Sequence, residues 1–186
     1  MINKKEFEQM RKELNEFEIK REDTIITSRD IIKLSKQIIY SLHRGETEVN
    51  NLVKEIKTKI KLLDKTKDYD TGISSVAFQE YVEAVAYFEF VKSDKIPSAK
   101  ELDVNIEAYL GGMADLTGEL VRKAVHEAIK KNFNSVLKIK ELVEEVYGEF
   151  LKFDLRNGEL RKKSDSIKWN LNKLEDLAFS LQSTRK

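Results

Sequence analysis

The chain has 186 residues, of which 36% are charged and 40% are apolar, and it contains seven glycines, one proline and no cysteine. The absence of cysteine excludes disulfide frameworks, thiolate metal sites and cysteine nucleophiles. The net charge of +1 argues neither for nor against a nucleic-acid partner, because basic and acidic residues could occupy opposite faces. The N-terminus has no signal-peptide core and no apolar run is long enough to span a membrane, so we expect a cytoplasmic protein.

The apolar spacing predicts one all-α domain over residues 1–186. No glycine or proline precedes Gly45, and apolar residues three and four apart from Phe7 to Leu42 predict a helix, or a nearly continuous helix pair, of about 40 residues. At about 1.5 Å per residue such a rod is about 60 Å long. A rod of that length usually packs beyond its own monomer, so we expect self-association.

The rest of the chain alternates helical segments with short breaks. A Lys-rich amphipathic helix is predicted near residues 47–65, and a turn follows at 68–75. The next helix, at about 73–92, is apolar nearly all round, which places it inside the fold or an assembly. Further helices are predicted at about 104–131, 135–153 and 158–182.

Four carboxylates lie where the helical spacing offers little compensation. Glu80 and Glu83 share one face of their helix, and none of their neighbours three or four positions away is basic. Asp115 and Glu119 are also four apart on one face, and only Glu119 has a cation in reach, Lys123. Such like-charge pairs cost a helix a few tenths of a kcal/mol, and more when they are desolvated. Another interaction must therefore offset the charge repulsion between these acids.

The spacing leaves two explanations open. In the first, the four acids are solvated or pair with basic residues on other helices, as many structural carboxylates do. In the second, two facing helices carry a carboxylate cluster that binds a hard divalent cation such as Mg²⁺ through oxygen ligands. A cation held in this way stabilises charge on a phosphodiester and lowers the pKa of an attacking water.

Four segments, in the right order along the chain, resemble the translin superfamily. They are "SRDIIKLSKQIIYSLHR", "FQEYVEAV", "YLGGMADLTGELVRKAV" and "LRKKSDSIKWNLNKLEDLAFSL". The second and third resemble the catalytic branch of that family, translin-associated factor X (TRAX), more than translin itself. The resemblance runs from about residue 25 to 182.

This resemblance implies an all-α fold of about seven helices that assembles into a hollow, barrel-like oligomer, octameric in known members. It also implies a metal-dependent endoribonuclease that encloses and cleaves single-stranded RNA. In the family, the acids of an E-x-x-E segment and of a D-x-x-x-E segment act together, and these positions are Glu80, Glu83, Asp115 and Glu119 here. We therefore expect Mg²⁺ or Mn²⁺ at these four residues.

The chain departs from eukaryotic TRAX in three ways. Eukaryotic members carry a longer basic N-terminal extension and a longer insertion between the catalytic helices, and they work beside a separate translin subunit. This shorter chain resembles a prokaryotic-type homologue, which we expect to form the whole shell as a homo-octamer. The alternative function is that of a non-catalytic, translin-like protein that binds single-stranded RNA or DNA.

Basic residues concentrate near the start of the last predicted helix. Arg161, Lys162 and Lys168 surround Trp169, an aromatic residue that could stack on a base of single-stranded nucleic acid. We predict RNA contacts at these four residues, and the alternative for Trp169 is that it fills a subunit interface, where tryptophan is enriched.

The two histidines, His43 and His126, are given no catalytic role. His43 comes at the end of the first predicted helix, where it would cap or pack, and His126 precedes Glu127 on a charged face.

Overall fold

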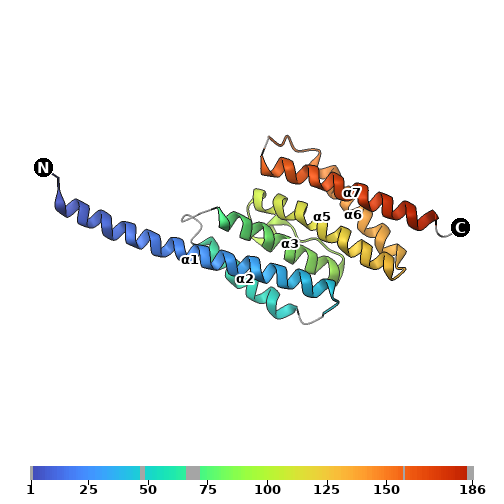
Figure 1. Ribbon diagram of the computed structural model, residues 1–186, viewed down its shortest axis with the longest axis horizontal. Helices are drawn as coiled ribbons and strands as arrows, with labels where there is room; N and C mark the ends of the chain where they lie inside the picture. The colour runs from blue at the N-terminus through green and yellow to red at the C-terminus, as the bar shows by residue number, and fades with distance from the viewer. Residues whose placement is uncertain (1, 47–48, 66–71, 157, 184–186) are drawn as a thin grey trace.

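The computed structural model describes residues 2–46, 49–65, 72–156 and 158–183. Seven helices occur within these residues (Figure 1). They are α1 (Lys4–His43), α2 (Asn50–Asp64), α3 (Ile73–Ser93), α4 (Ala99–Leu102), α5 (Ile106–Ile129), α6 (Phe133–Phe150) and α7 (Glu159–Ser183). The all-α prediction is confirmed, and each predicted helix is present with its ends shifted by a few residues. Residues 68–71 of the predicted turn at 68–75 lie outside the described residues, and its last three residues belong to α3.

The long helices lie side by side in an order that differs from their order in sequence. α2 packs on α1, α1 on α3, α3 on α5 and α5 on α7, while α6 covers α5 and α7 (Figure 1). α3 and α5 therefore lie at the centre of the bundle. The predicted burial of α3 is confirmed, because eleven of its residues are buried, from Ser74 to Phe90.

α1 is one continuous helix of 40 residues, as the sequence predicts. Its first turn is capped by the Asn3 side chain, which accepts a hydrogen bond from the Glu6 amide at 3.3 Å. It ends before Gly45, whose φ of 74° lies in the left-handed region that glycine adopts without strain. Residues 4–23, here called the α1 arm, are all exposed, and they project away from the other helices (Figure 1).

The crossing of α3 and α5 depends on a glycine. A Cβ atom on Gly112 would lie 2.5 Å from the Gln79 carbonyl oxygen and 2.6 Å from Cβ of Val82. Because real Cβ atoms do not approach other atoms so closely, the two helix backbones can only reach this separation with glycine at position 112. The segment "YLGGM" thus brings the acids of α3 and α5 toward one another.

One helix was not predicted from the sequence. α4 is a single turn whose N-cap, Ser98, and third residue, Glu101, form a reciprocal capping box. Four residues are too few to show an apolar period, so the periodicity gave no sign of it. Among the described residues, no helix is both long and apolar enough to cross a membrane.

Candidate functional site

The four predicted acids come together where α3 crosses α5. Glu80 and Glu83 lie on α3, and Asp115 and Glu119 lie on α5. The pKa of Glu83 is raised to about 8. Burial is the main cause, and the negative charges of Asp115, Glu80 and Glu119 add to it. Within the described part of the chain Glu83 makes no ion pair or hydrogen bond that would offset this cost. The fold thus creates a carboxylate cluster whose central member favours the protonated form.

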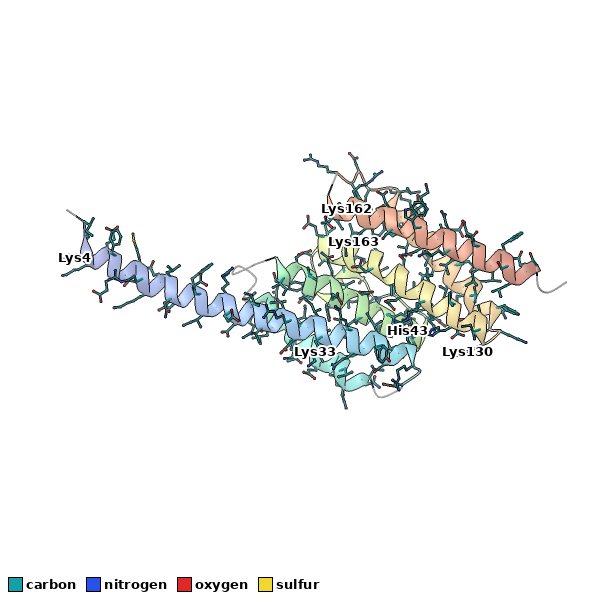
Figure 2. The ribbon with its side chains drawn as sticks, in the orientation of Figure 1. Lys4, Lys33, His43, Lys130, Lys162 and Lys163 are labelled. Carbon is teal, nitrogen blue, oxygen red and sulfur yellow. The ribbon has the colours of Figure 1, made fainter. Side chains whose placement is uncertain are left out.

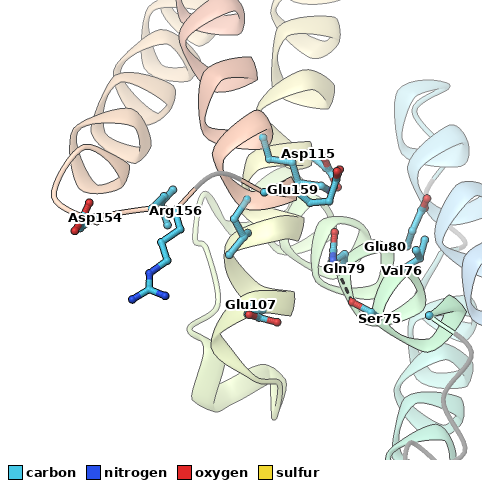
Figure 3. Close-up of a pocket in the computed structure, with 14 residues that line it drawn as sticks. Ser75, Val76, Gln79, Glu80, Glu107, Asp115, Asp154, Arg156 and Glu159 are labelled. Carbon is cyan, nitrogen blue, oxygen red and sulfur yellow. Dashed lines mark hydrogen bonds and ion pairs between the residues drawn. The ribbon is translucent and has the colours of Figure 1, made fainter.

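Glu80 and Asp115 also line a cavity of about 760 Å³ beside the cluster. Three further acids from the surrounding elements line it, namely Glu107, Asp154 and Glu159 (Figure 3). Arg156 and Lys163 supply the basic side chains of this lining. The cavity thus has seven charged residues in its lining, and two of the four cluster acids, Glu80 and Asp115, are among them.

Two of the four acids already pair with basic residues from other helices. The ammonium group of Lys163, on α7, donates a hydrogen bond to Asp115. His43, at the end of α1, lies with Nε2 at 2.5 Å from a carboxylate oxygen of Glu119. The explanation that these acids pair across helices is thus confirmed for Asp115 and Glu119. The sequence neighbour Lys123 is not the partner of Glu119, because it pairs with Glu127 at 3.6 Å.

His43 links three helices through one buried ring, whose side chain is only 2% exposed. Its Nδ1 lies 3.1 Å from the Tyr87 hydroxyl of α3, so a ring that donates from Nε2 to Glu119 accepts from Tyr87 at Nδ1. The hydrogen bond from His43 holds the pKa of Glu119 below its ordinary value. His126 of α5 stands edge-on to His43, with ring centroids 5.6 Å apart. His43 therefore orients Glu119 in its charged form.

Glu80 has a different electrostatic environment. Burial raises its pKa above the ordinary value, and the charge of Lys36 on α1 is the strongest influence opposing that rise. Glu80 thus faces a cation on α1, as Asp115 faces one on α7 and Glu119 faces His43. Sequence spacing missed Lys36, Lys163 and His43 as members of the site, because each acts on an acid more than 40 residues away in the chain.

The cluster offers the oxygen ligands that a hard divalent cation prefers. As the side chains stand, no three His, Asp or Glu residues within the described ranges form a group that would hold a metal ion. The ion pair with Lys163 occupies the Asp115 carboxylate. The chemistry of the donor set fits Mg²⁺ or Mn²⁺, and Glu83 is the acid whose charge is least compensated, since the charge of Lys163 offsets only part of the effect of burial and of the neighbouring acids.

The four residues predicted to contact nucleic acid lie on the surface of α7. Trp169 is 66% exposed, so it lies off the inward face of its helix. Arg161 pairs with Asp165 at 3.7 Å, and Lys162 pairs with Glu159 at 2.7 Å. Lys168 is exposed as well. Two of the three predicted cations are thus engaged by acids one helical turn away.

Comparison with known proteins places this geometry in a family. The Translin family model matches residues 19–183, which is most of the chain. The chain belongs to the translin family. An uncharacterized protein of Methanocaldococcus jannaschii is 34% identical over 174 residues, which cover 89% of this chain and 78% of that protein. Translin-associated protein X of Mus musculus is 24% identical over 225 aligned positions, covering 95% of this chain and 77% of its own.

Solved structures agree with this assignment. The structure of apo-NeC3PO has a TM-score of 0.88 at 30% identity and covers 94% of this chain and 96% of its own. A complex of AfC3PO with duplex RNA has a TM-score of 0.85 at 28% identity, and the match covers 97% of this chain and 98% of the AfC3PO chain. The predicted family and its translin-type fold are therefore confirmed.

Proposed function

We propose that this protein is a metal-dependent endoribonuclease that cleaves single-stranded RNA within a homo-oligomeric shell. The observation that carries the proposal is the carboxylate cluster: four acids from two helices meet at a crossing that Gly112 keeps tight, and the charge of Lys163 only partly compensates Glu83 there. A buried acid near three others destabilises the protein. Carboxylates with such perturbed pKa values cluster at functional sites, which supports a functional role for these four.

Each acid has a role in this proposal. Glu80, Glu83, Asp115 and Glu119 hold Mg²⁺ or Mn²⁺, and His43 keeps Glu119 charged and oriented toward the cluster. A divalent cation bound there stabilises negative charge on the phosphodiester and lowers the pKa of the attacking water. Lys163 and Arg156, which line the adjoining cavity, offer positive charge to the phosphates on either side of the scissile bond.

The relatives support nucleic acid as the substrate class and an assembly as the active form. AfC3PO has been solved with duplex RNA, and its fold matches this chain over nearly its whole length. The resemblance to the translin superfamily implies eight subunits around a central space. All four acids of the cluster lie on α3 and α5, so one subunit contains them. The adjoining cavity is formed by α3, α5, α7 and the loop that precedes α7.

A cleavage assay tests the proposal directly. A labelled single-stranded RNA should be cut in the presence of Mg²⁺ or Mn²⁺, and EDTA should stop the reaction. The products should carry 5′-phosphate and 3′-hydroxyl ends, because water rather than the neighbouring 2′-hydroxyl attacks the phosphorus. Products with cyclic 2′,3′-phosphates, or cleavage that persists in EDTA, would show that the mechanism is wrong.

Amide variants assign the activity to the cluster. Glu83→Gln and Asp115→Asn keep the side-chain shape but each remove one ligand charge, so cleavage should fall by at least about 100-fold. RNA affinity should stay similar or rise, since negative charge near the phosphates is reduced. Glu107→Gln is the matched control, because Glu107 lines the same cavity outside the cluster and its variant should cleave like the wild type.

A second function, a translin-like binder of single-stranded RNA or DNA without catalysis, is favoured by one observation. The Asp115 carboxylate is paired with Lys163, so part of the cluster is neutralised by the protein itself. If the wild type binds single-stranded RNA but does not cleave it with Mg²⁺ or Mn²⁺, and both amide variants melt at lower temperature, the acids are structural partners of cations on other helices and this second function holds.

A further inference from the structure

α1 carries a row of exposed cations along one strip of its surface. Arg29, Lys33 and Lys36 are exposed, and none of them makes an ion pair within the described part of the chain. Together with Tyr40 they line a groove of about 580 Å³. Lys33 marks the position of this groove on α1 in Figure 2. We call these four residues the α1 basic face.

Helix geometry places the four side chains in one line. Their spacing of four, three and four residues confines them to a sector of about 60° at 100° per residue, opposite the buried residues Ile31 and Ile38. From Arg29 to Tyr40 the row extends about 16 Å along the helix axis. Asp30, the one acid between residues 25 and 40, is held by Lys59 of α2 at 2.8 Å. The row is therefore a continuous strip of positive charge, in which Lys36 has a nearby carboxylate, that of Glu80, within the described residues.

The α1 basic face runs toward the carboxylate cluster. Lys36 acts electrostatically on Glu80, and His43, seven residues further along the same side of α1, contacts Glu119. A polyanion lying along the row would thus reach the acids at the point where Lys36 meets Glu80. The α7 cations differ in this respect, because Arg161 and Lys162 are already paired with acids of their own helix.

We propose that the α1 basic face binds the sugar–phosphate backbone of single-stranded RNA and directs it toward the carboxylate cluster. This inference rests on the proposed function for its substrate class. Three unpaired cations in a row suit a polyanion, and they do not suit a second copy of this chain placed symmetrically on the same face, which would meet them with like charges. Tyr40, 55% exposed with the Arg44 guanidinium 5.6 Å from its ring centroid, offers an aromatic surface to an unstacked base.

The test is binding without cleavage. A fluorescently labelled oligouridylate is titrated with the full-length protein in EDTA, so that catalysis plays no part. The triple variant Arg29→Gln/Lys33→Gln/Lys36→Gln should bind at least about tenfold more weakly at about 0.15 M salt. Its slope of log affinity against log salt should be smaller by about 2, from three phosphate contacts at about 0.7 each. Tyr40→Ala should weaken binding by about fivefold or more, and Tyr40→Phe should not.

Matched variants separate this face from general loss of positive charge. Lys54→Gln/Lys57→Gln/Lys61→Gln on α2 removes the same charge from exposed positions and should retain nearly the wild-type affinity and salt slope. The variant Arg161→Gln/Lys162→Gln/Lys168→Gln tests the α7 cluster in the same way. If either triple weakens binding as much as the α1 triple does, the α1 basic face is not the specific track and the inference fails.

Other outcomes are equally decisive. If the wild type does not bind the oligouridylate in EDTA, or binds a polyglutamate of equal charge as tightly, the inference is overturned. A changed oligomeric mass of the α1 triple in light scattering would assign the face to a subunit interface and overturn it too. If the wild type binds through this face but does not cleave RNA with Mg²⁺ or Mn²⁺, the inference stands and the proposed nuclease fails.

Discussion

At Glu83 the fold favours the protonated carboxyl, whereas the proposed metal binding needs the charged carboxylate. Its carboxyl is buried among Asp115, Glu80 and Glu119, and its pKa is raised from 4.5 to about 8. The protonated form is therefore the one that the metal-free fold favours. A bound divalent cation would reverse this preference, because it supplies more positive charge than Lys163 offers to Glu83.

This environment predicts a pH dependence of stability. The folded-state pKa lies above the unfolded one, so Glu83 stabilises the protein fully below about pH 4.5, and this contribution is lost as the pH rises through about 8. In EDTA and at fixed protein concentration, the free energy of unfolding of the wild type should fall between about pH 6 and pH 9 by about 1–3 kcal/mol more than that of Glu83→Gln.

Urea unfolding at the two pH values measures this difference. Glu107→Gln should lose stability with pH in parallel with the wild type, since Glu107 is exposed and outside the cluster. Excess Mg²⁺ at the higher pH should stabilise the wild type and leave Glu83→Gln nearly unchanged. Parallel pH profiles for the wild type and Glu83→Gln would mean that Glu83 is solvated, and the argument from its burial would then be wrong.

At the scale of elements, the α3–α5 crossing decides whether the acids can meet. Gly112→Ala raises intrinsic helix propensity by about 1 kcal/mol, but the new Cβ would overlap the Gln79 carbonyl and the Val82 side chain. Overpacking of this kind costs about 1–3 kcal/mol or more, and the obstacle is partly backbone, which cannot rotate away. We expect net destabilisation and a loss of RNA cleavage, because α3 and α5 are pushed apart.

Gly118→Ala, on the same helix, is the matched control for this prediction. A Cβ on Gly118 would meet only the Asn170 amide nitrogen at 3.8 Å, which is an ordinary contact. This variant should therefore gain about 0.5–1 kcal/mol from helix propensity and retain cleavage. Thermal melts that show equal stabilisation by both alanines would contradict the role of Gly112 in setting the crossing.

The elements could be predicted from the sequence because the information about them is local. The apolar residues of α1 recur every three or four positions, and Gly45 ends the helix, so its 40 residues follow from the pattern alone. The four acids were found for the same reason, because Glu80, Glu83 and Asp115 have no cation three or four residues away on their own helices and Glu119 lies one turn after Asp115. Their partners were not, because the contact of His43 with Glu119 joins residues 76 positions apart and is created only by packing.

At the scale of the whole molecule, the α1 arm is the feature that one subunit does not explain. Phe7, Met10 and Leu14 recur on one side of the arm and are 46–61% exposed, and Phe17 continues the row at 42%. An apolar row on a helix that projects from the bundle is typical of a surface that another chain covers. The family assignment is consistent with such an assembly, and the resemblance implies eight subunits.

Light scattering on the purified wild type should therefore give the mass of a large homo-oligomer, with eight copies expected. Each apolar side chain of the arm contributes about 1.5–3 kcal/mol when it is fully buried against a partner. Met10→Lys/Leu14→Lys removes two of them from every subunit and places charges in the contact, so the mass at micromolar concentration should fall.

Gln9→Lys/Asn15→Lys adds the same charge to the arm outside the apolar row and should keep the wild-type mass. Circular dichroism should show similar helix content in both variants, because the arm is a minor part of the helical chain. A monomeric wild type would contradict the assembly itself, whereas an undiminished oligomer of Met10→Lys/Leu14→Lys would show that the subunits associate through another surface.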